Sequence, residues 1–286
     1  MKNKKSFGFP MMEEMTVQTV RQYFEKKNSV ILPVGIIEQH GYHLPLITDA
    51  LTAREMAKMV AKKTGILVAP VLYSSFSGGG LSGTINISPS VMSLVINDTL
   101  VSLASQGFKK IYIFLGHGGG ENLNVLEISL KVLLRNNPIF SDVVLALFPV
   151  WSFDESGRGW KKAVKEKDWH AGWLETSMMM ALAPHLVHME EMKIDKKPDP
   201  SIKILDPDSS QQAEKIVDDP MVIPRMRQRP DIKVGVIGNP AKASAKLGKE
   251  LVRQAVSIMV KKISEIERQY DGKYKVVHIT PYPPLM

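Results

Sequence analysis

The chain has 286 residues, of which 44% are hydrophobic and 23% charged, a globular composition that excludes collagen-like and intrinsically disordered proteins. It contains no cysteine, which excludes disulfides, thiolate metal ligands and cysteine nucleophiles, so any metal ion must be held by His, Asp and Glu. The formal net charge of +8 comes from scattered Lys and Arg without interleaved aromatics, and we expect no nucleic-acid partner. No run approaches the ~18 apolar residues of a membrane span, and the N-terminus lacks the apolar core of a signal peptide. We therefore expect no membrane association and a cytoplasmic location.

Short β-branched runs alternate with helical patterns along the first half of the chain, which is typical of βαβ units and a mostly parallel sheet. Strands are predicted at 29–34, 66–71, 110–115 and 143–148, and helices at 48–63, 89–106 and 122–136. The segment 193–230 is rich in proline and charge, and we interpret it as an excursion. A last helix is predicted over 247–268. We expect a single α/β domain over residues 1–286, with ligands outside the carboxyl ends of the strands.

Side chains that bind metals gather directly after the first predicted strand. Glu38 and His40 are two residues apart, so in an extended chain they leave the same face and can converge on one cation. A glycine and a proline then allow the backbone to turn, which could return Asp49 to the same place at a helix start. Taken singly, these residues and the nearby His43 are better explained as hydrogen-bonded loop histidines and a helix-start carboxylate. Three ligand types within this short segment favour a metal site.

Two more polar segments lie beside predicted elements. His117 stands in the glycine-rich segment 116–120, which follows the strand at 110–115 and delivers the imidazole to the carboxyl end of the sheet. Such a loop could instead cradle phosphate, but its spacing fits neither common nucleotide-binding motif. His170 and Glu175 can reach one pocket from a loop and the first turn of a helix, although Glu175 could also be a capping carboxylate. These ligand types suit Zn, Mn or Fe(II), and a carboxylate shared by two ions is typical of hydrolytic sites.

Four ordered motifs resemble the creatininase (creatinine amidohydrolase) family. In chain order they are P-V-G-I-I-E-Q-H-G-Y-H-L-P-L-I-T-D at 33–49, G-H-G-G at 116–119, H-A-G-W-L-E-T-S at 170–177 and G-V-I-G-N-P-A-K-A-S at 235–244. The last motif has Asn239 where the family usually has Asp. The resemblance spans residues 33 to about 268. It implies a three-layer αβα fold with a mostly parallel central sheet, a divalent-metal site with one or two ions, and a homo-oligomer.

The resemblance also implies roles for individual residues. Glu38 and His117 would bind one metal ion and His40 the second, with Asp49 bridging the two. Glu175 would be the remaining carboxylate ligand, and His170 the general acid/base that hands a proton to the leaving group.

The chain departs from the family in two loops. After His117 the usual G-G-N reads G-G-G-E-N, so Glu121 competes with Glu175 as the carboxylate of the second metal, and we expect it near the substrate. The histidine that the family carries after the second strand is absent, because residues 74–84 read S-S-F-S-G-G-G-L-S-G-T.

All four tryptophans fall within residues 151–173. They could pack the edge of the sheet or a subunit contact, because aromatic side chains carry a large apolar area. Trp169 and Trp173 flank His170 and Glu175 in sequence, and we expect both of them, together with His43, to contact the substrate. A flat aromatic wall suits a small ring.

We therefore predict a divalent-metal-dependent hydrolase with two Zn, Mn or Fe ions per chain. Metal-activated water would attack a carbonyl of a small polar, cyclic substrate, with C–N hydrolysis of the creatinine amidohydrolase type. An alternative is hydrolytic C–C ring opening of a keto-inositol, because some proteins that resemble this chain act on dehydro-inososes. A rival of another class is a non-catalytic metal-binding scaffold, against which the intact ligand set speaks.

Overall fold

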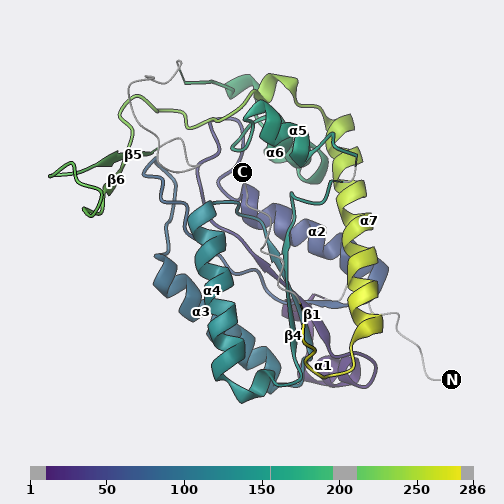
Figure 1. Ribbon diagram of the computed structural model, residues 1–286. Coiled ribbons are helices and arrows are strands. Elements are labelled where there is room, and N and C mark those ends of the chain that lie inside the picture. Colours follow the sequence, from purple (N-terminus) through teal and green to yellow (C-terminus); the bar gives the residue numbers. More distant parts are fainter. Residues whose placement is uncertain (1–10, 155, 196–210, 278–286) are drawn as a thin grey trace.

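The computed structural model describes residues 11–154, 156–195 and 211–277 (Figure 1). The α-helices of this part are α1 (Val17–Phe24), α2 (Thr48–Thr64), α3 (Pro89–Ser105), α4 (Gly120–Asn136), α5 (Trp160–Glu166), α6 (Trp173–Leu182) and α7 (Ala245–Gln269). The strands are β1 (Ser29–Val34), β2 (Leu67–Val68), β3 (Lys110–Leu115), β4 (Val144–Pro149), β5 (Gln211–Glu214) and β6 (Arg225–Gln228). Short 3₁₀ helices lie at Met12–Glu14, Pro138–Phe140, Pro184–Leu186, Met189–Glu191 and Pro240–Lys242.

Four strands form a parallel sheet in the order β2-β1-β3-β4. β1 lies beside β3 along its whole length, from Ser29 opposite Lys110 to Val34 opposite Leu115. All four strands therefore end at the same edge of the sheet, which is where βαβ folds place their ligands.

Both faces of the sheet are covered, because successive side chains of each strand point to opposite faces. Ile31 and Phe114 belong to an apolar cluster that includes residues of α2, α5, α6 and α7. Their neighbours Val30 and Ile113 belong to a second cluster with residues of α3 and α4. Figure 1 shows α3 and α4 on one side of the strands and α2 and α7 on the other. The expected three-layer α/β fold is confirmed.

The predicted boundaries agree with the structure to within two residues except in the second strand. The strand expected at 66–71 is reduced to Leu67–Val68, because Pro70 has no N–H to donate to the sheet. Backbone hydrogen bonds between this segment and β1 nevertheless continue beyond β2. The Ala69 amide donates to the Ile31 carbonyl, and the Leu72 amide donates to the Pro33 carbonyl. The helix predicted from 122 begins at Gly120.

The excursion predicted at 193–230 is described only in part, since 196–210 lie outside the described residues. Its later part is an antiparallel hairpin of β5 and β6 that extends away from the helices and the sheet (Figure 1). Among the described residues, no helix is both long enough and apolar enough to cross a bilayer.

Candidate metal centre

Glycines at the ends of β1 and β3 allow helix α2 to begin directly against the sheet. A Cβ on Gly116 would lie 2.1 Å from the carbonyl oxygen of Asp49, and one on Gly35 would lie 2.4 Å from the Cα of Ala50. Real Cβ atoms do not approach backbone atoms so closely, so larger residues would push the helix away. The two glycines therefore bring Asp49, in the first turn of α2, to the loops that carry Glu38 and His117.

The first group of converging ligands is Glu38, Asp49 and His117, all buried. His117 Nδ1 lies 3.1 Å from Glu38 Oε2 and 3.0 Å from Asp49 Oδ2. One nitrogen and two carboxylate oxygens thus face a common point, an arrangement that binds Zn²⁺, Mn²⁺ or Fe²⁺.

The second group is His40, Asp49 and Glu175. His40 Nδ1 lies 3.0 Å from the backbone carbonyl oxygen of Glu38, and since a carbonyl only accepts, the Nδ1–H must donate to it. In the neutral ring the lone pair is then on Nε2, which lies 3.2 Å from Asp49 Oδ1 and 3.6 Å from Glu175 Oε2. Three Lewis bases that would otherwise repel one another therefore converge, and a cation between them would resolve the repulsion.

These residues fit a pair of divalent ions. His40 Nε2 and Glu38 Oε2 are buried and have no hydrogen-bond partner of acceptable geometry among the described residues, as expected for atoms reserved for a metal. Asp49 turns one carboxylate oxygen to each histidine, which is the geometry of a bridging ligand. In a third group, ligand atoms of Glu38, His40 and His170 also lie within 4.8 Å of one another.

The electrostatics of the centre favour positive charge. Burial opposes protonation of His40, but the Asp49 and Glu175 carboxylates outweigh it and raise the pKa to about 10. His117 behaves alike, because Glu38 and Asp49 hold its pKa well above the usual value despite burial. Burial alone would raise the pKa of Asp49, but His40 and His117 lower it below the usual value. A divalent cation can therefore replace the protons that these histidines would otherwise hold.

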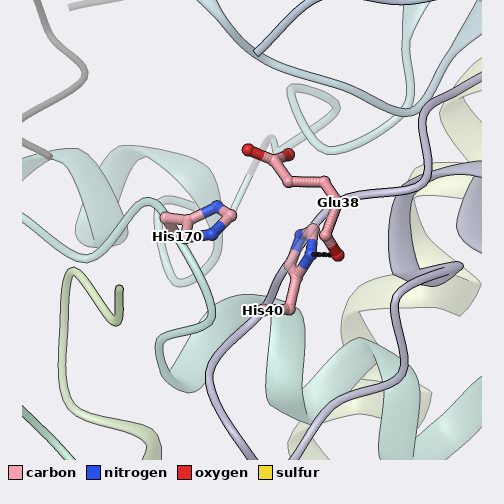
Figure 2. Close-up of side chains that lie close together, drawn as sticks. All are labelled: Glu38, His40 and His170. Atoms are coloured by element: carbon pink, nitrogen blue, oxygen red, sulfur yellow. Dashed lines mark hydrogen bonds between the residues drawn. The ribbon is translucent and has the colours of Figure 1, made fainter. Parts of the chain in front are cut away.

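His170 stands beside His40, with ring centroids 4.4 Å apart, and Figure 2 shows it facing the Glu38 carboxylate. His170 Nε2 lies 2.8 Å from the backbone carbonyl of Gln39, to which its N–H donates. Next to it, Ala171 has a positive φ of 51° and donates its amide to Glu175 Oε2 at 2.6 Å. This strained turn thus orients Glu175 toward the second ligand group.

A cavity of about 360 Å³ opens over these groups. Its ligand side is formed by Glu38, Asp49, His117, His170 and Glu175. The rest of the lining includes the aromatic and apolar residues Trp151, Trp160, Trp169, Leu81 and Ile237, and polar groups come from Ser77, Gln39 and Gln228. Trp169, which we expect beside the substrate, lines this cavity.

Three residues predicted to contact the substrate lie elsewhere. His43 is fully buried beneath the centre, where its Nε2 lies 2.9 Å from Thr176 Oγ1, and burial together with His40 lowers its pKa to about 4. Trp173 packs into the apolar cluster on the α7 side of the sheet and donates its indole N–H to Glu166, because the first turn of α6 turns this position inward. Glu121 is exposed on the first turn of α4 and is not among the described residues that line the cavity.

Other residues that line the cavity were not predicted from the sequence. Trp151 lies two residues after the end of β4, so the rule that ligands bind after the strands could have singled it out. Gln39 lies between Glu38 and His40 in sequence. We did not predict it in the site, because successive side chains of an extended chain point to opposite faces and Gln39 would then point away from the two ligands. Gln228 comes from β6 of the hairpin, and no motif or periodicity in the sequence indicates its position.

The family profile of creatininase (creatinine amidohydrolase) matches residues 13–263. The chain belongs to the creatininase family. The predicted resemblance is thereby confirmed, and the protein is a hydrolase.

Curated relatives act on different substrates. Creatinine amidohydrolase of Pseudomonas putida is 29% identical over 175 residues, 57% of this chain and 67% of that protein. A mycofactocin precursor peptide peptidase of Mycolicibacterium smegmatis is 26% identical over 266 residues, 89% of this chain and 92% of that protein. A 3-dehydro-scyllo-inosose hydrolase of Thermotoga maritima is 25% identical over 194 residues, 65% of this chain and 60% of that protein.

Solved structures share the fold. Creatinine amidohydrolase superposes with a TM-score of 0.69 at 21% identity, over 92% of this chain and 98% of that one. A manganese form of creatininase and a Zn–Zn form of a creatininase variant give TM-scores of 0.69 and 0.70, at 21% and 22% identity, each over 92% of this chain and over 100% and 99% of theirs.

Proposed function

We propose that this hydrolase depends on two divalent metal ions, Zn, Mn or Fe, that share Asp49. The observation that carries the proposal is the Asp49 carboxylate, whose two oxygens face His117 at 3.0 Å and His40 at 3.2 Å. Glu38 would complete the first site and Glu175 the second. When bound, such ions supply an activated water and polarise the substrate carbonyl.

The remaining roles fall to side chains around the cavity. The substrate would lie against Trp151, Trp160 and Trp169, here called the tryptophan wall, with its carbonyl turned toward Asp49 and Glu175. His170 would accept a proton from the attacking water at Nδ1 and pass it to the leaving group, because the Nε2–H is engaged by the Gln39 carbonyl at 2.8 Å. The indoles would exclude bulk water from the reacting carbonyl.

The substrate we propose is small, polar and cyclic, and the bond cleaved is an amide-type C–N bond. A cavity of about 360 Å³ is near the lower end for small-molecule sites and holds a single ring. The relatives named for creatinine and for a peptide both favour C–N cleavage. The inosose hydrolase relative supports the second candidate, C–C ring opening of a keto-inositol, since both reactions begin with attack on a carbonyl.

The test is turnover by metal-loaded protein offered creatinine, formylated amines and keto-inositols. We expect one C–N substrate to be consumed, and activity to disappear after chelation and return with Mn²⁺ or Zn²⁺. Consumption of the keto-inositol alone would overturn the amidohydrolase proposal. Fewer than about one ion per chain under replete conditions, with no turnover at all, would favour the non-catalytic scaffold.

Three further expectations stay predictions. We propose that the chain assembles with copies of itself, that it has no nucleic-acid or membrane partner, and that it works in the cytoplasm.

A further inference from the structure

The segment 233–239, here called the brace, is held at both ends by carboxylates from distant parts of the chain. Asp195 accepts three consecutive backbone N–H groups, from Lys233 at 2.7 Å, Val234 at 2.8 Å and Gly235 at 2.7 Å. At the other end, Asp168 accepts the amide of Asn239 at 2.7 Å. Short hydrogen bonds to a charged acceptor are about twice as strong as neutral ones, so both ends are firmly fixed.

The middle of the brace contacts the backbone of His170 directly. The amides of Trp169 and His170 donate to the Ile237 carbonyl at 3.0 and 3.2 Å, and the Ile237 amide donates back to the His170 carbonyl at 2.8 Å. Ile237 also lines the cavity. A shift of the brace would therefore move the backbone that carries His170.

A second connection runs from the brace to the His170 ring. The backbone carbonyl of Gly235 accepts a hydrogen bond from the side-chain Nε2 of Gln39 at 3.2 Å. The backbone carbonyl of Gln39 in turn accepts a hydrogen bond from His170 Nε2 at 2.8 Å. Gly235 has φ +75°, and a Cβ there would lie 2.3 Å from Gln39 Nε2. Gly235 thus binds Asp195 through its amide and Gln39 through its carbonyl, and so it connects Asp195 to the residue that contacts the His170 ring.

Asp195 lies near the start of the excursion, whose later strand β6 brings Gln228 to the cavity wall and to the Gly80 amide at 3.0 Å. The Asp195 carboxylate therefore ties the start of the excursion to the brace, which contacts His170. From this geometry we infer that Asp195 is a positioning residue, which acts through Gly235, Gln39 and Ile237 to fix the orientation of His170. Its effect on turnover rests on the role proposed above for His170, whereas its effect on the brace does not.

The first test is residue-resolved amide hydrogen exchange in Asp195→Asn, with Asp218→Asn as the matched control. Asp218 is an exposed carboxylate of the same excursion, so its substitution removes the same charge without touching the brace. We expect the amides of His170 and Ile237 to exchange at least about tenfold faster in Asp195→Asn, with β3 unchanged, and no change in the control. Faster exchange confined to 233–235, with His170 and Ile237 as in the wild type, would overturn the inference.

The second test uses whichever substrate is consumed by the wild type. Misplaced His170 should lower kcat about tenfold, with a smaller rise in KM because Trp169 shares the Ile237 contact, and it should leave the metal content within about twofold. Asp195→Glu, which keeps the charge but cannot align with all three amides, should give smaller changes in the same direction, and it replaces Asp195→Asn if that variant does not fold. An unchanged kcat alongside opened His170 and Ile237 amides would contradict the positioning role. If no substrate is found, only the proposed reaction fails, since the exchange measurement stands by itself.

Discussion

Two glutamates, Glu175 and Glu121, are candidates for the carboxylate ligand of the second metal ion in the proposed centre. Glu175 Oε2 lies 3.6 Å from His40 Nε2, whereas Glu121 is exposed at the start of α4 and lies outside the cavity lining. The sequence left these two as competitors because both stand in a motif near a histidine. Their positions are the reason why we propose Glu175 as the ligand.

We predict that Glu175→Gln binds one divalent ion fewer per chain than the wild type, because an amide is a poor replacement for an ionised carboxylate ligand. Glu121→Gln should bind as many as the wild type and serves as the matched control. Elemental analysis after gel filtration measures both. The opposite pattern, with loss in Glu121→Gln alone, would move the second site to the start of α4.

His43 gives the fold a pH dependence of definite sign. Its pKa is lowered to about 4 by burial and by His40, whereas in the unfolded chain it stays near 6.5. Between these values the unfolded state binds the extra proton, so stability is full above about pH 6.5 and is lost as the pH falls toward about 4.

We predict that His43→Gln flattens this dependence by up to about 1.4 kcal/mol per pH unit between pH 4 and 6.5. Urea unfolding of the metal-free wild type and variant at several pH values checks it, since the other titrating groups are common to both. Parallel curves would show that His43 does not titrate as its burial implies.

At the scale of elements, the motif glycines matter as much as the ligands they precede. Gly116 permits the close approach of β3 and α2, and a Cβ there would collide with the Asp49 carbonyl. This contact joins elements that are far apart in sequence, so no local pattern indicates it.

We predict that Gly116→Ala destabilises the fold by at least about 2 kcal/mol and also lowers metal content, because α2 must move away from β3 with Asp49 on it. Gly79→Ala, where the added Cβ meets nothing nearer than 3.5 Å, should change stability by less than about 1 kcal/mol. Chemical denaturation compares the two. Equal stabilities would mean that the approach of β3 to α2 is not tight.

The sequence predicted this layer of structure well where local rules suffice. β1 and β3 have the expected bounds, and β4 is shifted by one residue, because continuous β-branched and aromatic runs mark buried parallel strands. The strand-end rule also pointed to Glu38, His40 and His117, and the turn expected after His40 pointed to Asp49; their ligand atoms converge in the structure. The placements of His43 and Trp173 depend instead on which face a loop or a first helical turn presents after packing, and sequence spacing does not contain that information.

Across the whole molecule, the β5–β6 hairpin contacts the rest of the described chain at its base, where Gln228 accepts the Gly80 amide, and its connecting loop extends into solvent. Its connecting loop exposes large apolar side chains, with Ile216 at 102%, Met221 at 89% and Ile223 at 88%. An isolated two-stranded hairpin is marginal in water, and clustered exposed apolar groups mark contact sites.

We predict that the wild type sediments as a homo-oligomer, and that the double variant Met221→Asp, Ile223→Asp shifts it toward smaller species by placing charge in the contact. Ile194→Asp, another exposed apolar position outside the hairpin, is the control and should leave the assembly intact. A monomeric wild type at micromolar concentration would contradict the prediction.

The central claim is that two metal ions share Asp49 at the carboxyl edge of the sheet. Anomalous diffraction from crystals loaded with Mn²⁺ tests it most directly. We expect two peaks about 3.5–4 Å apart, one beside Glu38 and His117 and one beside His40 and Glu175, with Asp49 between them. A single peak that does not touch Asp49, or peaks remote from these five side chains, would contradict it.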